Sequence, residues 1–329
     1  MKTVSQIGEK KVIEIIMKCL EMPRNMPVPF GDDVSAVQID ENMLAVVKTD
    51  MLVGKTDVPS GMSFKQAARK AVVMNVSDFA AKGVKPLAVL ASLGLPRNTT
   101  EGEVKQIGTG LNEAAREYGA YVIGGDTNES SDLVISCSLF GTCDKKSLVK
   151  RGGAQPGDIV AVTEQFGKTA AGLKMLLENL EAPEEIRKPL IDAVFMPKAR
   201  LKEGLALAKT GALTASIDSS DGLAWSLHEL SEASNVGFNI ENVPLAPEVI
   251  EFAKANDLDP LELGLYGGEE YELVFTVKPE LWSKVEKATR NVGATLTRIG
   301  KATKEKRLEL RLNGETRTIE RRGWEHFKT

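Results

Sequence analysis

Hydrophobic and polar positions follow two different periods along this chain of 329 residues, and the change of period marks its elements. Residues 1–20 carry apolar residues at helical spacing with charges between them, which predicts an amphipathic helix. The apolar run in 40–50 predicts a β-strand, and small or apolar residues at helical spacing over 63–83 predict a long helix. The pattern continues with predicted strands at 86–96, 120–128 and 131–143 and a predicted helix at 100–119.

A concentration of glycine and proline at 150–158 is the best candidate for a domain boundary. Strands and helices alternate again beyond it, with strands predicted at 159–162, 213–218 and 272–278 and helices at 169–180, 197–209 and 223–234. The pattern therefore predicts two α+β (α/β) domains, residues 1–150 and 151–329.

Composition excludes several classes of protein. Hydrophobic residues make up 42% of the chain and charged residues 27%, enough to bury a large core, and the net charge of −4 provides no basic field for nucleic acid or an anionic membrane. No uncharged apolar run reaches the roughly 20 residues that a membrane helix needs. Three cysteines without a CxxC pair fit a reducing compartment, so a cytoplasmic protein is predicted. Two histidines leave little material for histidine-based metal or triad chemistry.

Three partial motifs fail on inspection. The stretch 166–172 resembles the end of a Walker A loop, but Val162 stands where the first glycine is required. Gly108 and Gly110 begin a GxGxxG dinucleotide-binding motif, but the third glycine is missing. An EF-hand beginning at Asp218 would need glycine at the position of Leu223.

Aspartates at strand ends and on helix faces form the clearest chemical signal. Any one of them is more often a turn or N-cap residue, and Asp221 could simply cap the helix that follows it. Two carboxylates about 4 Å apart repel each other by roughly 4 kcal/mol at an effective dielectric of about 20, so a cluster would need a cation. Hard oxygen ligands select Mg²⁺, which in turn implies a phosphate substrate. The aspartates are Asp33, Asp50, Asp78, Asp126, Asp218 and Asp221.

Glycine pairs precede acidic residues at 124–128 and 267–275, where they would allow the backbone to approach a ligand closely. A tight turn before an edge strand is the alternative interpretation of each. Arg151 in the boundary segment suits a phosphate or simply the surface. Trp324 in the C-terminal tail either docks onto its own domain or stacks on a flat cationic ligand.

Seven motifs in order, "FGDDVSAV", "KTDMLV", "MNVSDFAAKGVKP", "IGGDTN", "RGGAQPGD", "IDSSDGL" and "GGEEYELVF", resemble the thiamine-monophosphate kinase family. This family belongs to the superfamily of aminoimidazole ribonucleotide synthetase. The match runs from about residue 30 to the closing "GWEHF", and "KTDMLVGKTDVPSGM" resembles the archaeal branch. The resemblance implies the two-domain synthetase-like fold and ATP-dependent phosphorylation of thiamine monophosphate to thiamine diphosphate. It also implies a homodimer whose N-terminal mixed sheets pair, with ATP and several Mg²⁺ ions between the domains.

The resemblance also implies roles for single residues. Thr49 and the six aspartates would surround the metal ions, Gly125, Asp126, Arg151 and Ser220 would contact ATP, and Asp57, Glu269 and Trp324 would hold the thiamine substrate. Two positions depart from the family pattern. Lys48 stands where bacterial members often have a small hydroxyl residue, which favours ligation by the backbone there, and Asp57 stands where they usually have histidine.

Other members of the superfamily, and another class of protein, are the alternatives. Selenophosphate synthetase needs a reactive cysteine near its N-terminal glycine loop and the hydrogenase maturation member ends in one, and this chain has neither. A purine-pathway, ATP-dependent amidine or imidazole-ring synthetase of the same superfamily and a non-catalytic sensor of Mg-nucleotide remain open. For a kinase the acceptor phosphate is already ionised, so we expect direct in-line transfer without a catalytic acid or base.

Overall fold

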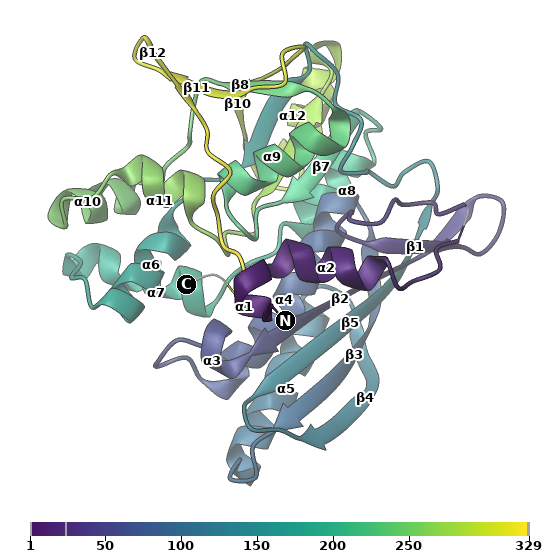
Figure 1. The fold of residues 1–329 in the computed structure, drawn as a ribbon, viewed down its shortest axis with the longest axis vertical. Helices are drawn as coiled ribbons and strands as arrows, with labels where there is room; N and C mark the ends of the chain where they lie inside the picture. The colour runs from purple at the N-terminus through teal and green to yellow at the C-terminus, as the bar shows by residue number, and fades with distance from the viewer. Residues whose placement is uncertain (1, 24, 328–329) are drawn as a thin grey trace.

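Two β-sheets and the long helix α4, Phe64–Lys82, form the frame of the molecule (Figure 1). The structure is a computed structural model and describes residues 2–23 and 25–327. Helix α4 contacts strands of both sheets, so the two halves of the chain meet along it.

The first sheet has five strands in the order β1-β2-β5-β3-β4, and only the pair β3–β4 is parallel. Helices α4 and α5 cover one face of this sheet, whereas large apolar side chains on its other face, such as Met51 and Phe140, are exposed. The strand predicted at 40–50 was expected to end on Asp50, but it continues to Val53, so Asp50 lies inside it. Asp126 also lies inside its strand, which agrees with the range predicted at 120–128. The elements of this half are β1 Ser35–Gln38, β2 Met43–Val53, α3 Gly54–Asp57, β3 Lys85–Leu95, α5 Glu101–Glu117, β4 Tyr121–Glu129 and β5 Val134–Asp144.

The sequence specifies both ends of α4. Ser63 is its N-cap and forms a capping box with Gln66, and Gly83 ends it in the left-handed conformation at φ 68°. Nearly every residue from Ala67 onward is buried, which is expected for a helix packed on all sides. The neighbouring helix approaches so closely that a Cβ on its Gly204 would lie 2.0 Å from the Ala80 carbonyl oxygen.

The second sheet has seven strands in the order β12-β11-β8-β10-β6-β9-β7. All neighbours are antiparallel except β8 and β11, so this half is α+β with a mixed sheet. Its strands are β6 Ile159–Thr163, β7 Leu213–Asp218, β8 Gly237–Ile240, β9 Leu273–Val277, β10 Leu296–Thr303, β11 Leu308–Leu312 and β12 Glu315–Thr318. Its helices are α6 Lys168–Glu178, α7 Glu184–Phe195, α8 Leu201–Ala208, α9 Leu223–Ser234, α10 Pro247–Ala255, α11 Pro260–Tyr266, the 3₁₀ turn Pro279–Leu281 and α12 Trp282–Arg290.

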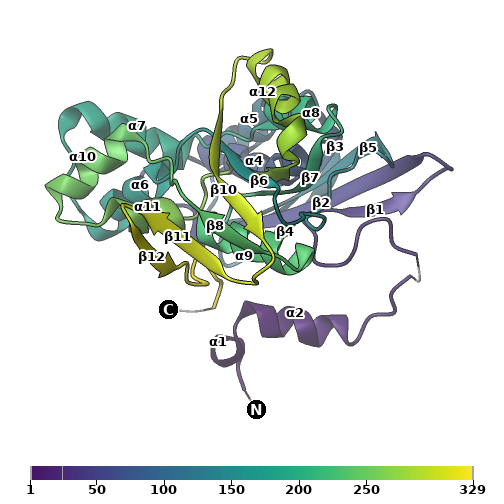
Figure 2. The same ribbon diagram turned by 90° about the horizontal axis from the view of Figure 1, so that it is seen from above.

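The N-terminal segment differs from the single helix predicted over 1–20. It forms two helices, α1 Val4–Ile7 and α2 Glu9–Met17, because Gly8 between them has φ 74° and interrupts the helical path. No residue of α1 or α2 is buried, and Figure 2 shows both lying apart from the sheets. The backbone N–H of His326 in the C-terminal tail donates to Glu9 Oε2 at 3.2 Å. Within 2–23 and 25–327, no helix is long and apolar enough to cross a membrane.

Candidate active site

Three predicted aspartates come together where α4, β7 and the loop before β1 meet. Asp78 lies on α4, Asp218 is the last residue of β7, and Asp33 lies just before β1. Each is buried and offers one carboxylate oxygen, and these three oxygens all lie within 4.8 Å of one another. We call them the aspartate cluster. Ser77 Oγ donates a hydrogen bond to Asp218 Oδ2 at 2.5 Å, which ties the end of β7 to α4.

Strand β2 brings Asp50 and Lys48 to the same place. Side chains two apart on a strand point to one face, and here that face packs against α4. Lys48 Nζ lies 3.1 Å from Asp50 Oδ1 and 3.1 Å from Asp78 Oδ2, so it bridges the two carboxylates. Asn75, one turn before Asp78 on α4, accepts a hydrogen bond from the Asp50 backbone N–H at 3.0 Å.

Two further cations hold the loop that carries Asp33. Lys82 Nζ is fully buried and lies 2.7 Å from Asp32 Oδ1 and 2.7 Å from Asp33 Oδ2. The Arg151 guanidinium pairs with Asp33 and, at 2.8 Å, with Glu229 on α9. Arg151, predicted to contact ATP, therefore lies at the aspartate cluster rather than on an isolated surface.

Burial and mutual repulsion act unequally on these carboxyl groups. Burial raises the pKa of Asp78 well above its usual value, and burial with repulsion from Asp33 raises the pKa of Asp218 to about 6. Burial with repulsion from Asp218 raises the pKa of Asp221 to about 7. Burial alone would also raise the pKa of Asp33, but Lys82 and Arg151 lower it to about 2. Within the part of the chain that the structure describes, neither Asp218 nor Asp221 forms an ion pair that would offset the cost of its burial.

Backbone hydrogen bonds join four more predicted residues beside the cluster. The backbone N–H of Glu269 donates to the Ser220 carbonyl oxygen at 2.6 Å. The backbone N–H of Trp324 donates to the Asp221 carbonyl oxygen at 3.1 Å. The N-cap of α9 is Gly222, so Asp221 does not cap this helix as its position had suggested. Glu269 adopts φ 64°, a backbone strain for a residue other than glycine that is frequent at functional sites.

Glu269 is connected to Asp57 through a buried lysine. Lys70 on α4 is 1% exposed, and its Nζ lies 2.5 Å from Glu269 Oε1 and 2.9 Å from the Asp57 carbonyl oxygen. The Asp57 carboxylate accepts a hydrogen bond from the Val53 N–H at 2.7 Å, so this side chain holds its own turn. Glu269 Oε2 is buried without a hydrogen-bond partner among the described residues.

Thr49, Gly125 and Asp126 lie elsewhere in this single chain. Thr49 points to the face of β2 opposite Asp50, where its hydroxyl donates to the Cys137 carbonyl oxygen at 3.1 Å. Gly125 and Asp126 lie in the edge strand β4, and the register places Gly125 three strands from Asp50, about 14 Å away. A Cβ on Gly125 would lie 1.9 Å from the Ala91 carbonyl oxygen, so close strand packing already requires this glycine.

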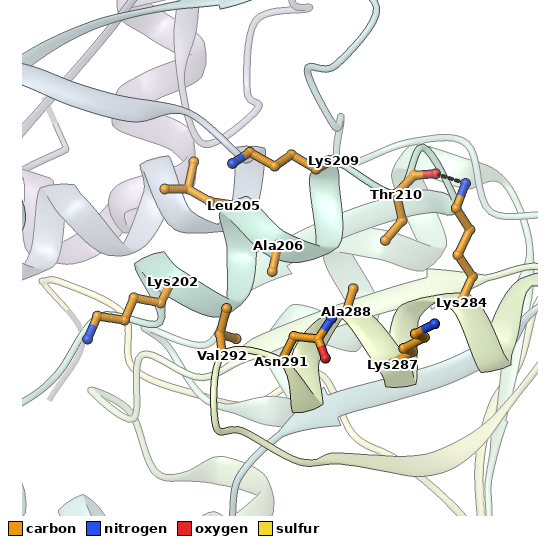
Figure 3. Close-up of a pocket in the computed structure, with 10 residues that line it drawn as sticks. All are labelled: Lys202, Leu205, Ala206, Lys209, Thr210, Lys284, Lys287, Ala288, Asn291 and Val292. Atoms are coloured by element: carbon orange, nitrogen blue, oxygen red, sulfur yellow. Dashed lines mark hydrogen bonds between the residues drawn. The ribbon is translucent and has the colours of Figure 1, made fainter.

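A separate hollow on the second half lies between α8 and α12 (Figure 3). It contains none of the predicted site residues and no carboxylate among the ten residues that line it. Its cationic residues are Lys202, Lys209, Lys284 and Lys287. Lys284 Nζ donates to the Thr210 carbonyl oxygen at 2.6 Å. The hollow thus has the wrong charge for a metal site, and the aspartate cluster remains the candidate active site.

Comparison with known proteins agrees with this arrangement. The family model "AIR synthase related protein, N-terminal domain" matches residues 31–143, and the corresponding C-terminal domain matches 155–313. Thiamine-monophosphate kinase of Nitrosopumilus maritimus is 36% identical over 325 residues, which cover 99% of this chain and 100% of that protein. The chain belongs to the thiamine-monophosphate kinase family. The Pyrococcus horikoshii kinase is 37% identical over 301 residues, 91% of each chain.

A solved structure of the family has the same fold. "AaThiL complexed with AMPPCP and TMP" superimposes with a TM-score of 0.86 at 30% identity and covers 99% of each chain. The thiamine-monophosphate kinase family and the two-domain fold, both predicted from the seven motifs, are therefore confirmed. The roles of single residues stay predictions that rest on their positions in this structure.

Proposed function

We propose that this protein transfers the γ-phosphoryl group of ATP to thiamine monophosphate and so forms thiamine diphosphate. The observation that carries the proposal is the convergence of Asp33, Asp78 and Asp218 within 4.8 Å in a member of this kinase family. The relative AaThiL was solved with AMPPCP and TMP, which represent the two substrate classes. Asp218 is buried and forms no ion pair among the described residues, so a bound cation would stabilise the cluster.

The donor set suits Mg²⁺. Carboxylate oxygens with no histidine or cysteine in the cluster are hard ligands, and burial, which raises the pKa values of Asp78, Asp218 and Asp221, makes a bound cation favourable to their ionised forms. Asp33, Asp78 and Asp218 would hold the metal, with Asp50 and Asp221 beside them. Bound Mg²⁺ would neutralise charge on the phosphates of both substrates.

The residues of the chain itself would then position the reactants. The attacking oxygen of thiamine monophosphate is already ionised near neutral pH, so alignment and charge stabilisation suffice without a general base. Arg151, at the cluster but in contact with Asp33 and Glu229, would exchange part of these contacts for ATP phosphate. Ser220, in the loop between Asp218 and Asp221, would contact the nucleotide. We propose direct transfer without a phosphoenzyme.

Glu269 and Trp324 would bind the thiamine end. The Trp324 side chain is 53% exposed while its backbone is fixed to the Asp221 loop, so an indole face is available beside the site. Thiamine carries a positive thiazolium ring, which suits stacking on tryptophan and pairing with a carboxylate such as Glu269. Asp57 is linked to Glu269 by Lys70, and its carboxylate would act mainly by holding the turn that contains it.

We also propose that the protein is a homodimer formed through the first sheet. The face not covered by helices exposes large apolar side chains, a pattern typical of an interaction surface. These residues are Val47, Met51, Leu87, Leu90, Tyr121, Ile123 and Phe140. Gly125, Asp126 and Thr49 lie on this face or its free edge, so any part they take in binding ATP or metal would require the assembled dimer. Residues 1–150 would form this dimerising, nucleotide-binding domain, and 151–329 the domain that completes the site.

A product assay tests the proposed reaction. Purified protein with ATP, Mg²⁺ and thiamine monophosphate should form thiamine diphosphate and ADP in equal amounts, measured by chromatography. Thiamine and other phosphate monoesters serve as alternative acceptors, and formylglycinamidine ribonucleotide tests the imidazole-ring synthetase. Turnover of the last compound alone, or nucleotide binding without any product, would replace the proposed function by one of the two alternatives.

A further inference from the structure

Lys48 pairs with two carboxylates of the candidate active site. Its side chain is 20% exposed, and its Nζ contacts Asp50 and Asp78, both at 3.1 Å. Lys48 belongs to β2, whereas Asp78 belongs to α4, so the ammonium group links two elements of the first half of the chain. This position is the one that a shared metal ion between two carboxylates would occupy.

The other two cations of the site are committed to different carboxylates. Lys82 binds Asp32 and Asp33. Arg151 binds Asp33 and Glu229. Neither forms an ion pair with Asp50 or Asp78, so among the described residues only Lys48 neutralises these two groups. Asp218 has a hydroxyl partner, Ser77, and no ion pair among the described residues.

We propose that Lys48 is a built-in cation that takes the place of one divalent ion between Asp50 and Asp78. This inference rests on the proposed metal-dependent kinase function and adds a statement about metal number. Because the ammonium group already pairs with Asp50 and Asp78, and Lys82 and Arg151 pair with Asp33, metal ions bind toward Asp218, the member of the aspartate cluster that forms no ion pair among the described residues. A chain with a neutral residue at position 48 would need one more divalent ion to balance the same carboxylates.

Counting bound Mn²⁺ tests the inference directly. Wild type, Lys48→Ser and Lys48→Arg are titrated with Mn²⁺ at a fixed, saturating concentration of AMPPCP, and free Mn²⁺ is followed by electron paramagnetic resonance. We expect Lys48→Ser to bind one more Mn²⁺ per chain than wild type, and Lys48→Arg, which keeps the charge, to match wild type. Lys85→Ser, which removes an exposed lysine of β3, is the matched control and should also match wild type.

A thermal measurement gives a second readout. Removing the cation leaves Asp50 and Asp78 unpaired, so Lys48→Ser should melt at a lower temperature than wild type without metal. Mg²⁺ should then raise its Tm by about 3 °C or more beyond the rise seen in wild type, because the variant binds an additional ion in the folded state. Lys48→Met, which keeps the aliphatic stem, gives the same comparison if the serine variant does not fold.

The outcomes separate this inference from the proposed function. Thiamine diphosphate formation is assayed in the same samples, so absence of product from wild type would count against the proposed function. Product from wild type with equal Mn²⁺ counts in wild type and Lys48→Ser would overturn the inference about Lys48. Equal counts with tighter binding by the variant would also overturn it, because they would mean that Lys48 competes with an ion rather than replacing one.

Discussion

The two faces of the first sheet differ in almost every chemical respect. The face covered by α4 carries Lys48 and Asp50, and it meets the buried carboxylates of Asp78 and Asp218. The open face carries exposed apolar side chains such as Met51 and Phe140. Adjacent residues of β2 therefore belong to different surfaces, because side chains alternate along a strand. One strand can thus serve both a polar site and an apolar interface, and a substitution in it should affect one of them and leave the other.

Asp218→Asn should have the largest effect on the covered face. It removes one carboxylate charge from the cluster while keeping the size of the side chain, so we expect kcat to fall by roughly a hundredfold or more. Folding stability should not decrease, because the native carboxyl group is buried without an ion pair and its pKa is raised to about 6. Steady-state kinetics with thermal unfolding measures both effects. Asp40→Asn, in an exposed turn, is the control, and near-normal turnover of Asp218→Asn would remove this residue from the mechanism.

Phe140→Asp should break the open face instead. A charge in the centre of the proposed interface would be desolvated without a partner, so the variant should be monomeric at micromolar concentration. Multi-angle light scattering reports the mass, and wild type should be a dimer. Leu177→Asp, an equally drastic change at an exposed leucine of α6, should remain dimeric. A monomeric wild type would show that the apolar face has another use.

Trp324→Ala tests the proposed binding of the thiamine ring beside the candidate active site. Loss of stacking worth roughly 0.5–2 kcal/mol should raise the KM for thiamine monophosphate by about two- to thirtyfold and leave the KM for ATP nearly unchanged. Phe327→Ala, which shortens another exposed aromatic residue of the same tail, controls for general effects on docking of the tail. An equal rise in both KM values would mean that Trp324 only docks the tail onto the Asp221 loop.

The smallest expected effect is a dependence of stability on pH. Asp218 and Asp221 have folded-state pKa values of about 6 and about 7, raised above the usual 3.8 mainly by burial. The folded state therefore binds more protons than the unfolded state between about pH 4 and 7, and its stability should fall as pH rises through this window. Calorimetry without divalent ions should show a Tm that decreases from pH 5 to 8. Mg²⁺ should reduce this loss at pH 8, and a flat profile in both conditions would contradict the raised pKa values of these two carboxyl groups.

Much of the fold could be predicted because long elements repeat their pattern several times. The long helix predicted over 63–83 is confirmed as α4, with Ser63 as its N-cap and Gly83 as its C-cap. Short elements such as β8 and β12 span four residues each, too few to show a period. The break at Gly8 was missed because the apolar spacing continues across it.

The acidic residues of the candidate active site could be predicted from the sequence, but its lysines could not be predicted as well. Asp33, Asp78 and Asp218 are far apart in the chain, and only their shared chemistry and the resemblance to a family indicated that they meet. Lys70 and Lys82 were missed, although a charged residue in the otherwise apolar pattern of α4 is a usable signal, because lysine is rarely fully buried without a partner. The role of Lys48 could not be predicted, because its contacts depend on how β2 packs against α4.

The transfer of label from ATP tests the central claim most directly. Wild type and Asp218→Asn are incubated with [γ-³²P]ATP, Mg²⁺ and thiamine monophosphate, and the label is followed both in thiamine diphosphate and in the protein. The account predicts label in thiamine diphosphate with wild type, almost none with Asp218→Asn or after EDTA, and no labelled protein when the acceptor is omitted. Stable label on the protein without acceptor would contradict direct transfer. Full transfer by Asp218→Asn would contradict the assignment of the reaction to the aspartate cluster.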